Sequence, residues 1–233
     1  MQRLILSSAL LFSLLTTGRA QSPLTHQRLF DTIPYIMDHH NNRLALFAQE
    51  PQTTGGTLFL GNSITEGGPW PELLKEETIV NRGISGDITF GVLKRLDEII
   101  ERKPDKLFML IGINDLSMDI PPPVVADNVR KILERLKAES PGTELFLQSI
   151  LPLNEELDGF LQHFGKSEQV LVCNQLLYKV AAEAQVTFVN LYPYFLDDRQ
   201  RLKEELTYDG IHLTRAGYEH WATHLQSLGY LEK

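Results

Sequence analysis

Cysteine is nearly absent from this chain. Of the 233 residues only Cys173 is a cysteine, which excludes an internal disulfide and any zinc site built from several thiolates. Apolar residues at helical spacing surround it, so we expect a buried structural thiol. There is no His-Glu-x-x-His run or comparable ligand spacing, and we therefore expect neither a bound metal nor a cofactor.

Positive charge is also in short supply. The chain has 22 Lys and Arg against 30 Asp and Glu, for a formal net charge of −8 at pH 7. Such a balance argues against nucleic acid or an anionic membrane surface as a partner. A small molecule or a glycan of little charge is the more compatible ligand. The sequence does not predict an oligomeric state.

Long hydrophobic runs are missing except for one near the start. Residues 4–15 are mostly apolar, too few for the roughly 20 that a membrane-spanning helix needs. Arg3 precedes the run and Gly18-Arg19-Ala20 follows it, the layout of a secretory signal peptide. A retained amphipathic anchor is the alternative, but the run is apolar on every side. We expect cleavage near Ala20-Gln21 and a periplasmic or secreted protein without stable membrane insertion.

What remains, residues 21–233, has the size of one domain. The full chain is 42% apolar, enough for one substantial core. Short branched or aromatic runs predict five strands, at residues 57–60, 78–81, 106–111, 144–150 and 186–191. Helical spacing between them predicts helices at residues 90–102, 124–138 and 169–184. This alternation predicts an α/β fold, a three-layer sandwich around a mainly parallel five-stranded sheet.

Residues 24–50 precede the first predicted strand and have helical spacing of apolar residues. We expect this stretch to pack across the sheet as a helix. It contains His26, His39 and His40, and adjacent histidines on a helix point about 100° apart, which makes them a poor ligand pair. A solvated helix face is the interpretation that we favour for all three.

The first candidate for chemistry is Ser63. It ends the run Gly61-Asn62-Ser63 directly after the first predicted strand, and ligands of parallel sheets bind at the carboxyl ends of strands. The alternative is structural: Ser63 would cap the following helix, with Glu66 at the capping-box position three residues later. Taken alone, the run favours this alternative.

Asp209 and His212 change that balance. They lie three residues apart in a short loop near the C-terminus. A serine hydroxyl is a poor nucleophile at neutral pH and needs an imidazole to take its proton and a carboxylate to orient the imidazole. We expect Asp209 to hold one nitrogen of His212 while the other faces Ser63, with Thr214 capping a closing helix.

Two further turns offer hydrogen-bond donors. Gly86 lies in Gly83-Ile84-Ser85-Gly86 after the second predicted strand, and Asn114 follows the third. With the amide of Ser63, the Gly86 amide and the Asn114 side chain can bind the oxyanion formed when a serine attacks an ester carbonyl. Either turn can also be purely structural, since Gly and Asn-Asp are common turn formers.

These blocks, in this order, resemble the SGNH (GDSL-type) hydrolase family. The resemblance runs from about Asp38 to Leu228 and rests on residues 61–66 and 208–218, Gly-Asn-Ser-Ile-Thr-Glu and Tyr-Asp-Gly-Ile-His-Leu-Thr-Arg-Ala-Gly-Tyr. It implies a flavodoxin-like fold with Ser63 as nucleophile, Asp209 and His212 completing a triad, and Ser63, Gly86 and Asn114 as the oxyanion hole. Asn62 departs from the family's usual Asp, which is not the triad acid, so we expect activity to survive.

Within the family, Leu60 to Glu66, Gln148 to Pro152 and Leu191 to Pro193 look most like platelet-activating-factor acetylhydrolase-like proteins and carbohydrate or sialate O-acetylesterases. The resemblance implies a serine esterase acting on short acyl esters, with acetylated carbohydrate as the leading substrate class. Asn62, Phe160 and Phe164 are the candidate substrate contacts, the phenylalanines because residues 152–168 can overhang the site; an ordinary surface loop is the alternative.

Three other functions compete with this one. A lysophospholipase or acetylhydrolase of lipids uses the same triad, and a glycan-binding module on the same fold needs none. An α/β-hydrolase lipase requires a Gly-x-Ser-x-Gly elbow, with glycine where Thr65 stands. Intact Ser63, Asp209 and His212 argue against the binding module.

Overall fold

The computed structural model describes residues 34–76, 78–157, 159 and 163–232. Five strands form one sheet in the order β2-β1-β3-β4-β5, and every neighbouring pair is parallel. The strands are β1 (Thr57–Gly61), β2 (Val80–Gly83), β3 (Lys106–Leu110), β4 (Glu144–Gln148) and β5 (Thr187–Val189). The predicted α/β fold with a five-stranded parallel sheet is confirmed.

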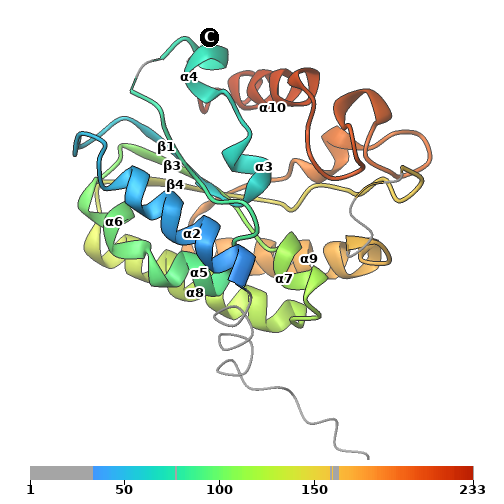
Figure 1. Ribbon diagram of the computed structural model, residues 1–233, viewed down its shortest axis with the longest axis horizontal. Coiled ribbons are helices and arrows are strands. Elements are labelled where there is room, and N and C mark those ends of the chain that lie inside the picture. Colours follow the sequence, from blue (N-terminus) through green and yellow to red (C-terminus); the bar gives the residue numbers. More distant parts are fainter. Residues whose placement is uncertain (1–33, 77, 158, 160–162, 233) are drawn as a thin grey trace, which may run out of the picture.

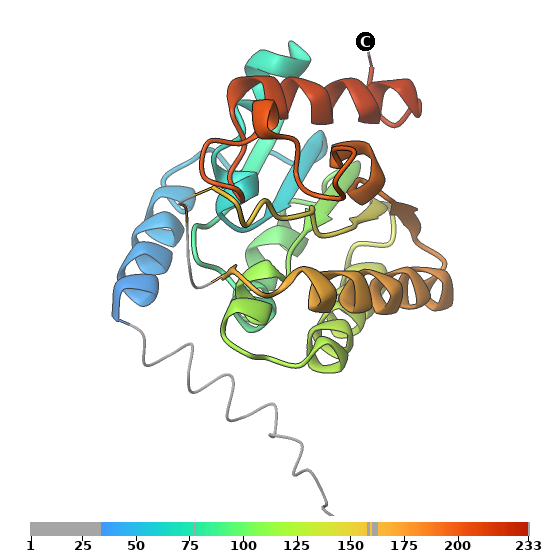
Figure 2. The ribbon, with the colours of Figure 1, turned by 90° about the vertical axis from the view of Figure 1, so that its right-hand side faces the viewer.

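Helices cover both faces of this sheet (Figures 1 and 2). On one face lie α4 (Trp70–Leu74) and α10 (Arg215–Ser227). On the other lie α8 (Pro122–Glu139) and α9 (Ser167–Ala184), which pack against each other. All residues of β1 are buried, as a strand sandwiched between two helical layers must be.

Aromatic rings fill the layer between the sheet and α10. Phe59, Phe108 and Phe146 are register partners on β1, β3 and β4, and their rings stack at centroid distances of 5.1 and 4.4 Å. Trp70 stacks on Phe59 at 4.0 Å, and Trp221 meets Trp70 edge-on at 4.8 Å. Because all five rings are buried, this layer fixes α4 and α10 on the sheet.

The strand order reverses direction between β1 and β3, so the loops after these strands run to opposite sides of the sheet. A crevice for ligands forms at such a switch point. The loop after β1 leads into the short helix α3 (Ser63–Glu66), and the loop after β3 leads into α7 (Ile113–Ser117). Ser63 and Asn114 therefore start from adjacent strands on either side of this point.

Several strands and helices begin or end at residues other than those predicted. The second strand begins at Val80 instead of residue 78, and β5 is only three residues long. The helix predicted at residues 124–138 starts two residues earlier because Pro122 occupies its first turn, where proline needs no hydrogen bond from its nitrogen. The helix predicted at residues 169–184 likewise starts early, at Ser167.

The single helix predicted over residues 90–102 is wrong. The segment forms α5 (Thr89–Lys94) and α6 (Leu96–Glu101), which meet at Arg95 with φ −106° and ψ 12°. The Arg95 side chain turns inward and donates hydrogen bonds to the carboxylate of Asp87 and to the carbonyls of Gly61 and Arg82. This buried network outweighs the local helical preference of the segment.

Part of the predicted N-terminal helix is present as α2 (Pro34–Phe47), while residues 24–33 and His26 lie outside the described residues, as do residues 1–20. The solvated face expected for the histidines is wrong for His40, which is 3% exposed and lies 3.9 Å from Asp87. His39 contacts Glu66. No helix in the described part of the chain combines the length and apolar character needed to cross a bilayer.

Candidate active site

Ser63 is the first residue of α3, presented by a tight turn. Asn62 is the N-cap, and its side-chain oxygen accepts a hydrogen bond from the Ile64 amide at 3.0 Å. Gly61 has no room for a side chain, because a Cβ there would collide with the Thr65 hydroxyl and the Leu110 carbonyl. The alternative in which Ser63 caps the helix is therefore wrong: Asn62 does so, and the Ser63 hydroxyl is left for another partner.

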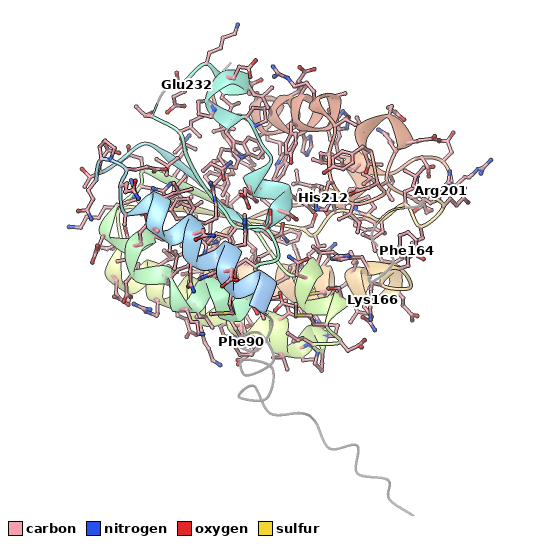
Figure 3. The ribbon with its side chains drawn as sticks, in the orientation of Figure 1. Phe90, Phe164, Lys166, Arg201, His212 and Glu232 are labelled. Carbon is pink, nitrogen blue, oxygen red and sulfur yellow. The ribbon has the colours of Figure 1, made fainter. Side chains whose placement is uncertain are left out.

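That partner is the imidazole of His212. Nε2 of His212 lies 2.9 Å from Oγ of Ser63, and Nδ1 lies 2.6 Å from Oδ2 of Asp209. The other carboxylate oxygen, Oδ1, accepts hydrogen bonds from the backbone amides of Ile211 and His212. Asp209 thus holds the ring of His212 through Nδ1 and its backbone through the amide. The structure brings the three predicted residues into one hydrogen-bonded line (Figure 3 labels His212 beside α3).

The loop that carries Gly86 reaches the same place. Gly86 has φ +78°, a left-handed conformation that favours glycine. Within the described residues, the amides of Ser63 and Gly86 donate to no other protein group. Unpaired backbone donors at a half-buried turn are what an oxyanion requires.

Asn114 is fixed at both ends of its side-chain amide. Its Nδ2 donates to the Asp87 carbonyl at 2.9 Å, and its Oδ1 lies 3.1 Å from Nε2 of His163. A primary amide has two N–H groups, so one remains after the bond to Asp87. At 7% exposure, the side chain is held in one orientation and ties the loop after β3 to the loop of Gly86.

Glu66 ties that loop to α3. Its Oε2 accepts hydrogen bonds from both the amide and the hydroxyl of Ser85, and His39 and Arg43 from α2 approach the same carboxylate at 3.0 and 3.3 Å. Burial raises the pKa of Glu66, but the hydrogen bonds of Ser85 and His39 and the charge of Arg43 together hold it below its ordinary value. Glu66 therefore stays ionised beside Gly86.

A second carboxylate, Asp87, supports the loop from inside. It is fully buried and pairs with Nε of Arg95 at 2.9 Å, while the Ile88 amide donates to its other oxygen. Burial raises the pKa of Asp87 to about 6, although the charge and hydrogen bond of Arg95 oppose the shift. The pair fixes the backbone whose carbonyl receives Asn114.

Asp115, next to Asn114, is buried without a cationic partner among the described residues. It accepts hydrogen bonds from the amide and hydroxyl of Thr89, and Asn128 donates to the same hydroxyl. Burial raises the pKa of Asp115 to about 7; Thr89 opposes the shift and the charge of Asp87 adds to it. This interior network holds α7 and α5 together below the site.

The segment after β4 packs on the site from the other side. Gly159 lies so close to the loop of Asp209 that a Cβ would collide with the Asp209 carbonyl, and the Asn154 amide donates to the Gly210 carbonyl at 2.9 Å. Together with His163 on Asn114, these contacts join Asn154, Gly159 and His163 to the predicted oxyanion and triad loops.

The three predicted substrate contacts differ in position. Asn62 is fully buried and so offers no surface to a substrate; its role in shaping the turn replaces the expected contact. Phe160 lies outside the described residues. Phe164 is half-buried in the turn before α9 and is drawn apart from His212 in Figure 3, so its contact with substrate stays a prediction.

No cluster of three or more potential metal-ligating side chains occurs in the described ranges. What the sequence did not identify is the support beneath the site: Glu66, Ser85, Asp87, Arg95 and the contact of His163 with Asn114. Only the short spacing of Gly83 to Asp87 hinted at a constrained loop, because the partners of these side chains come from distant segments.

A model of the GDSL-like lipase/acylhydrolase family matches residues 59–220 of the chain, which span the loops of Ser63, Gly86, Asn114, Asp209 and His212. The chain belongs to this family. It is an acyl ester hydrolase, and the predicted resemblance to GDSL-type hydrolases is confirmed.

Relatives of this hydrolase include other esterases. It is 28% identical over 176 residues to the arylesterase of Vibrio mimicus, covering 69% of this chain and 81% of that protein. It is 26% identical over 188 residues to platelet-activating factor acetylhydrolase IB subunit alpha2 of Rattus norvegicus, covering 78% of each. A solved structure from Streptococcus pneumonia, provisionally named a platelet activating factor, matches with a TM-score of 0.75 and 30% identity over 89% of this chain and 99% of that one.

Proposed function

We propose that this hydrolase removes short acyl groups, chiefly acetyl, from carbohydrate esters through a covalent intermediate on Ser63. The hydrogen-bonded line Asp209–His212–Ser63 carries the proposal, with links of 2.6 and 2.9 Å. Distances of this size allow direct proton transfer from the serine hydroxyl to the imidazole.

In the first half of the cycle, Oγ of Ser63 attacks the ester carbonyl carbon and Nε2 of His212 takes its proton. The carbonyl oxygen becomes negative and is bound by the amides of Ser63 and Gly86 and the remaining N–H of Asn114. The C–O bond to the alcohol then breaks, His212 returns the proton to the departing oxygen, and an acyl-enzyme remains.

Water completes the cycle. His212 takes a proton from a water molecule, whose oxygen attacks the acyl carbon. The second oxyanion that forms is bound by the same three hydrogen-bond donors. When this collapses, Oγ of Ser63 leaves and is reprotonated by His212, and the carboxylic acid departs. Every step uses groups of this chain.

Acetyl as the acyl group is supported by the acetylhydrolase among the relatives, and carbohydrate by the resemblance of the motifs to carbohydrate O-acetylesterases. The same relative favours a second candidate, a lipid substrate that carries an acetyl ester. The net charge of −8 weighs only against a lipid that is presented in an anionic surface, because such a surface repels an anionic protein.

The test is a panel of acetylated xylosides, acetylated sialic acids and acetylated phospholipids, assayed with the native hydrolase and with Ser63→Ala. We expect the sugars to give the highest kcat/KM and Ser63→Ala to lose at least about 10⁴-fold on every ester. A preference for phospholipid would select the lipid esterase. Rates no higher than the uncatalysed background for both proteins would leave a glycan-binding module as the better account.

We further propose that the hydrolase is exported and loses residues 1–20 on the way. The support is the layout of Arg3, the apolar run and Ala20 in the sequence. N-terminal sequencing of the protein recovered from its native host is expected to begin at Gln21; recovery of intact Met1 outside the cell would contradict cleavage.

A further inference from the structure

An exposed aromatic ring lies beside His212. Among the exposed large hydrophobic side chains of the described residues, Tyr208 is the most exposed, at 68%. All other residues from Leu206 to Leu213 are buried or half-buried. Leaving a tyrosine in water at a loop this well packed gains nothing for folding, since burial of its ring is what would stabilise the fold.

The position of the ring is set by the backbone. The Tyr208 amide donates to the His212 carbonyl, as does the Thr207 hydroxyl, and Thr207 and Leu213 form an antiparallel bridge. The Tyr208 ring then lies 15° from the plane of the His212 imidazole, with 5.8 Å between the centroids. The two rings are therefore stacked and nearly parallel, and the Tyr208 ring is the more exposed of the two.

The chemistry of the triad decides which part of a substrate meets the Tyr208 ring. His212 returns a proton to the departing alcohol, so the alcohol oxygen must come within hydrogen-bond reach of Nε2. The carbonyl oxygen faces the opposite way, toward the donors of Gly86 and Asn114. Groups attached to the alcohol oxygen therefore extend past the imidazole, whereas the acyl chain does not.

We propose that Tyr208 is a specificity-determining residue that binds the alcohol portion of the ester, and that the ligand it fits is a six-membered ring with an apolar face. A sugar in its chair form has an apolar C–H face, and an aryl group has two flat faces; both can lie against an exposed tyrosine ring. This inference rests on the proposed function, because it requires His212 to act on the leaving alcohol.

The test compares kcat/KM for three acetates that share the acyl group and differ in the alcohol: acetylated methyl xyloside, phenyl acetate and butyl acetate. This parameter covers the steps up to release of the alcohol and excludes hydrolysis of the common acetyl-enzyme. We expect Tyr208→Ala to lower it by about 3- to 10-fold for the two ring-bearing esters, the range of aromatic contacts, and to leave butyl acetate unchanged.

Two variants control this result. Tyr208→Phe keeps the ring and is expected to keep the native preference. Tyr178→Ala removes another exposed tyrosine, 60% exposed on α9 and packed edge-on to Phe188, and is expected to change none of the three rates.

An equal loss on all three esters would overturn the inference, because it would mean that Tyr208 acts by holding His212. No loss on any ester would overturn it as well. Failure of the proposed function gives different results: undiminished hydrolysis by Ser63→Ala removes the triad, and native protein that cleaves phenyl acetate but no acetylated sugar removes the carbohydrate substrate while leaving the role of Tyr208 testable.

Discussion

At the scale of single residues, only one end of the Asn62 side chain takes part in hydrogen bonding. Its Oδ1 caps α3 through the Ile64 amide, while its Nδ2 is buried and has no hydrogen-bond partner in the described structure. A buried donor without a partner costs free energy. The site therefore accommodates Asn at position 62, although the N–H groups of its side chain make no hydrogen bond in the described structure.

This leads to a prediction for Asn62→Asp. The carboxylate keeps the capping oxygen, removes the unpaired donor and places negative charge at a helix start, so we expect kcat/KM on phenyl acetate to stay within about threefold of the native value. In contrast, Asn62→Ala removes the cap and should lower the free energy of unfolding by about 1 kcal/mol. Steady-state kinetics and urea unfolding check the two expectations; an inactive but folded Asn62→Asp would refute the first.

The role of Glu66 is an example of what the sequence alone could not predict for a single residue. Its spacing from Ser63 matched a capping box, a contact within one helical turn. Its partners are instead Ser85, His39 and Arg43, which come from other segments. Residues such as Ser63, Asp209 and His212 were predictable because the chemistry demands those types, whereas a supporting carboxylate accepts any donor that the fold delivers.

At the scale of elements, the break between α5 and α6 exists for Arg95. Its side chain is 1% exposed and pairs with the fully buried Asp87, and two of its hydrogen bonds reach carbonyls at the ends of β1 and β2. The break between α5 and α6 is therefore the place from which Arg95 holds Asp87, the residue after Gly86.

We expect Arg95→Met to lower the free energy of unfolding by about 3 to 5 kcal/mol, because it leaves the Asp87 carboxylate buried without its counter-charge. Adding Asp87→Asn to this variant should recover part of the loss. Arg135→Met is the matched control: Arg135 pairs with Glu139 and Asp97 at the surface, where such pairs contribute about 0 to 1 kcal/mol. Chemical denaturation measures all four proteins, and a loss for Arg95→Met no larger than that for Arg135→Met would contradict the expectation.

The same contrast explains which elements could be predicted. The three central strands, β1, β3 and β4, are short runs of mostly Leu and Phe that are buried on both faces. Such a run can be recognised in the sequence without knowing what packs against it. The ends of β5 and the split at Arg95 depend on hydrogen bonds to distant segments, for which the local pattern holds no information.

At the scale of the whole molecule, the buried carboxyls make stability depend on pH. Burial raises the pKa of Asp115 to about 7 and that of Asp87 to about 6, from an ordinary value of 3.8. Between the ordinary and the raised values the folded protein holds protons that the unfolded chain releases. Stability from these groups is thus present below about pH 4 and is lost as pH rises toward 7.

We therefore expect the free energy of unfolding to fall between about pH 4 and pH 7, and Asp115→Asn to reduce this fall by an amount on the order of 1 kcal/mol or more. Asp119→Asn, at a position whose side chain is 84% exposed, serves as the control and should leave the pH profile unchanged. Urea unfolding at intervals of pH checks both. An unaltered slope in Asp115→Asn would show that another group is responsible.

The layer of rings between the sheet and α10 has an optical consequence. The chain contains two tryptophans, and both lie in that layer, 4.8 Å apart and perpendicular. The tryptophan fluorescence and the tryptophan bands in near-ultraviolet circular dichroism of this hydrolase therefore report on that layer. Trp221 lies on α10, which begins three residues after His212. A change in tryptophan emission therefore reports that α10, and with it the loop of His212, separates from the sheet. It does not report unfolding of the helices on the opposite face.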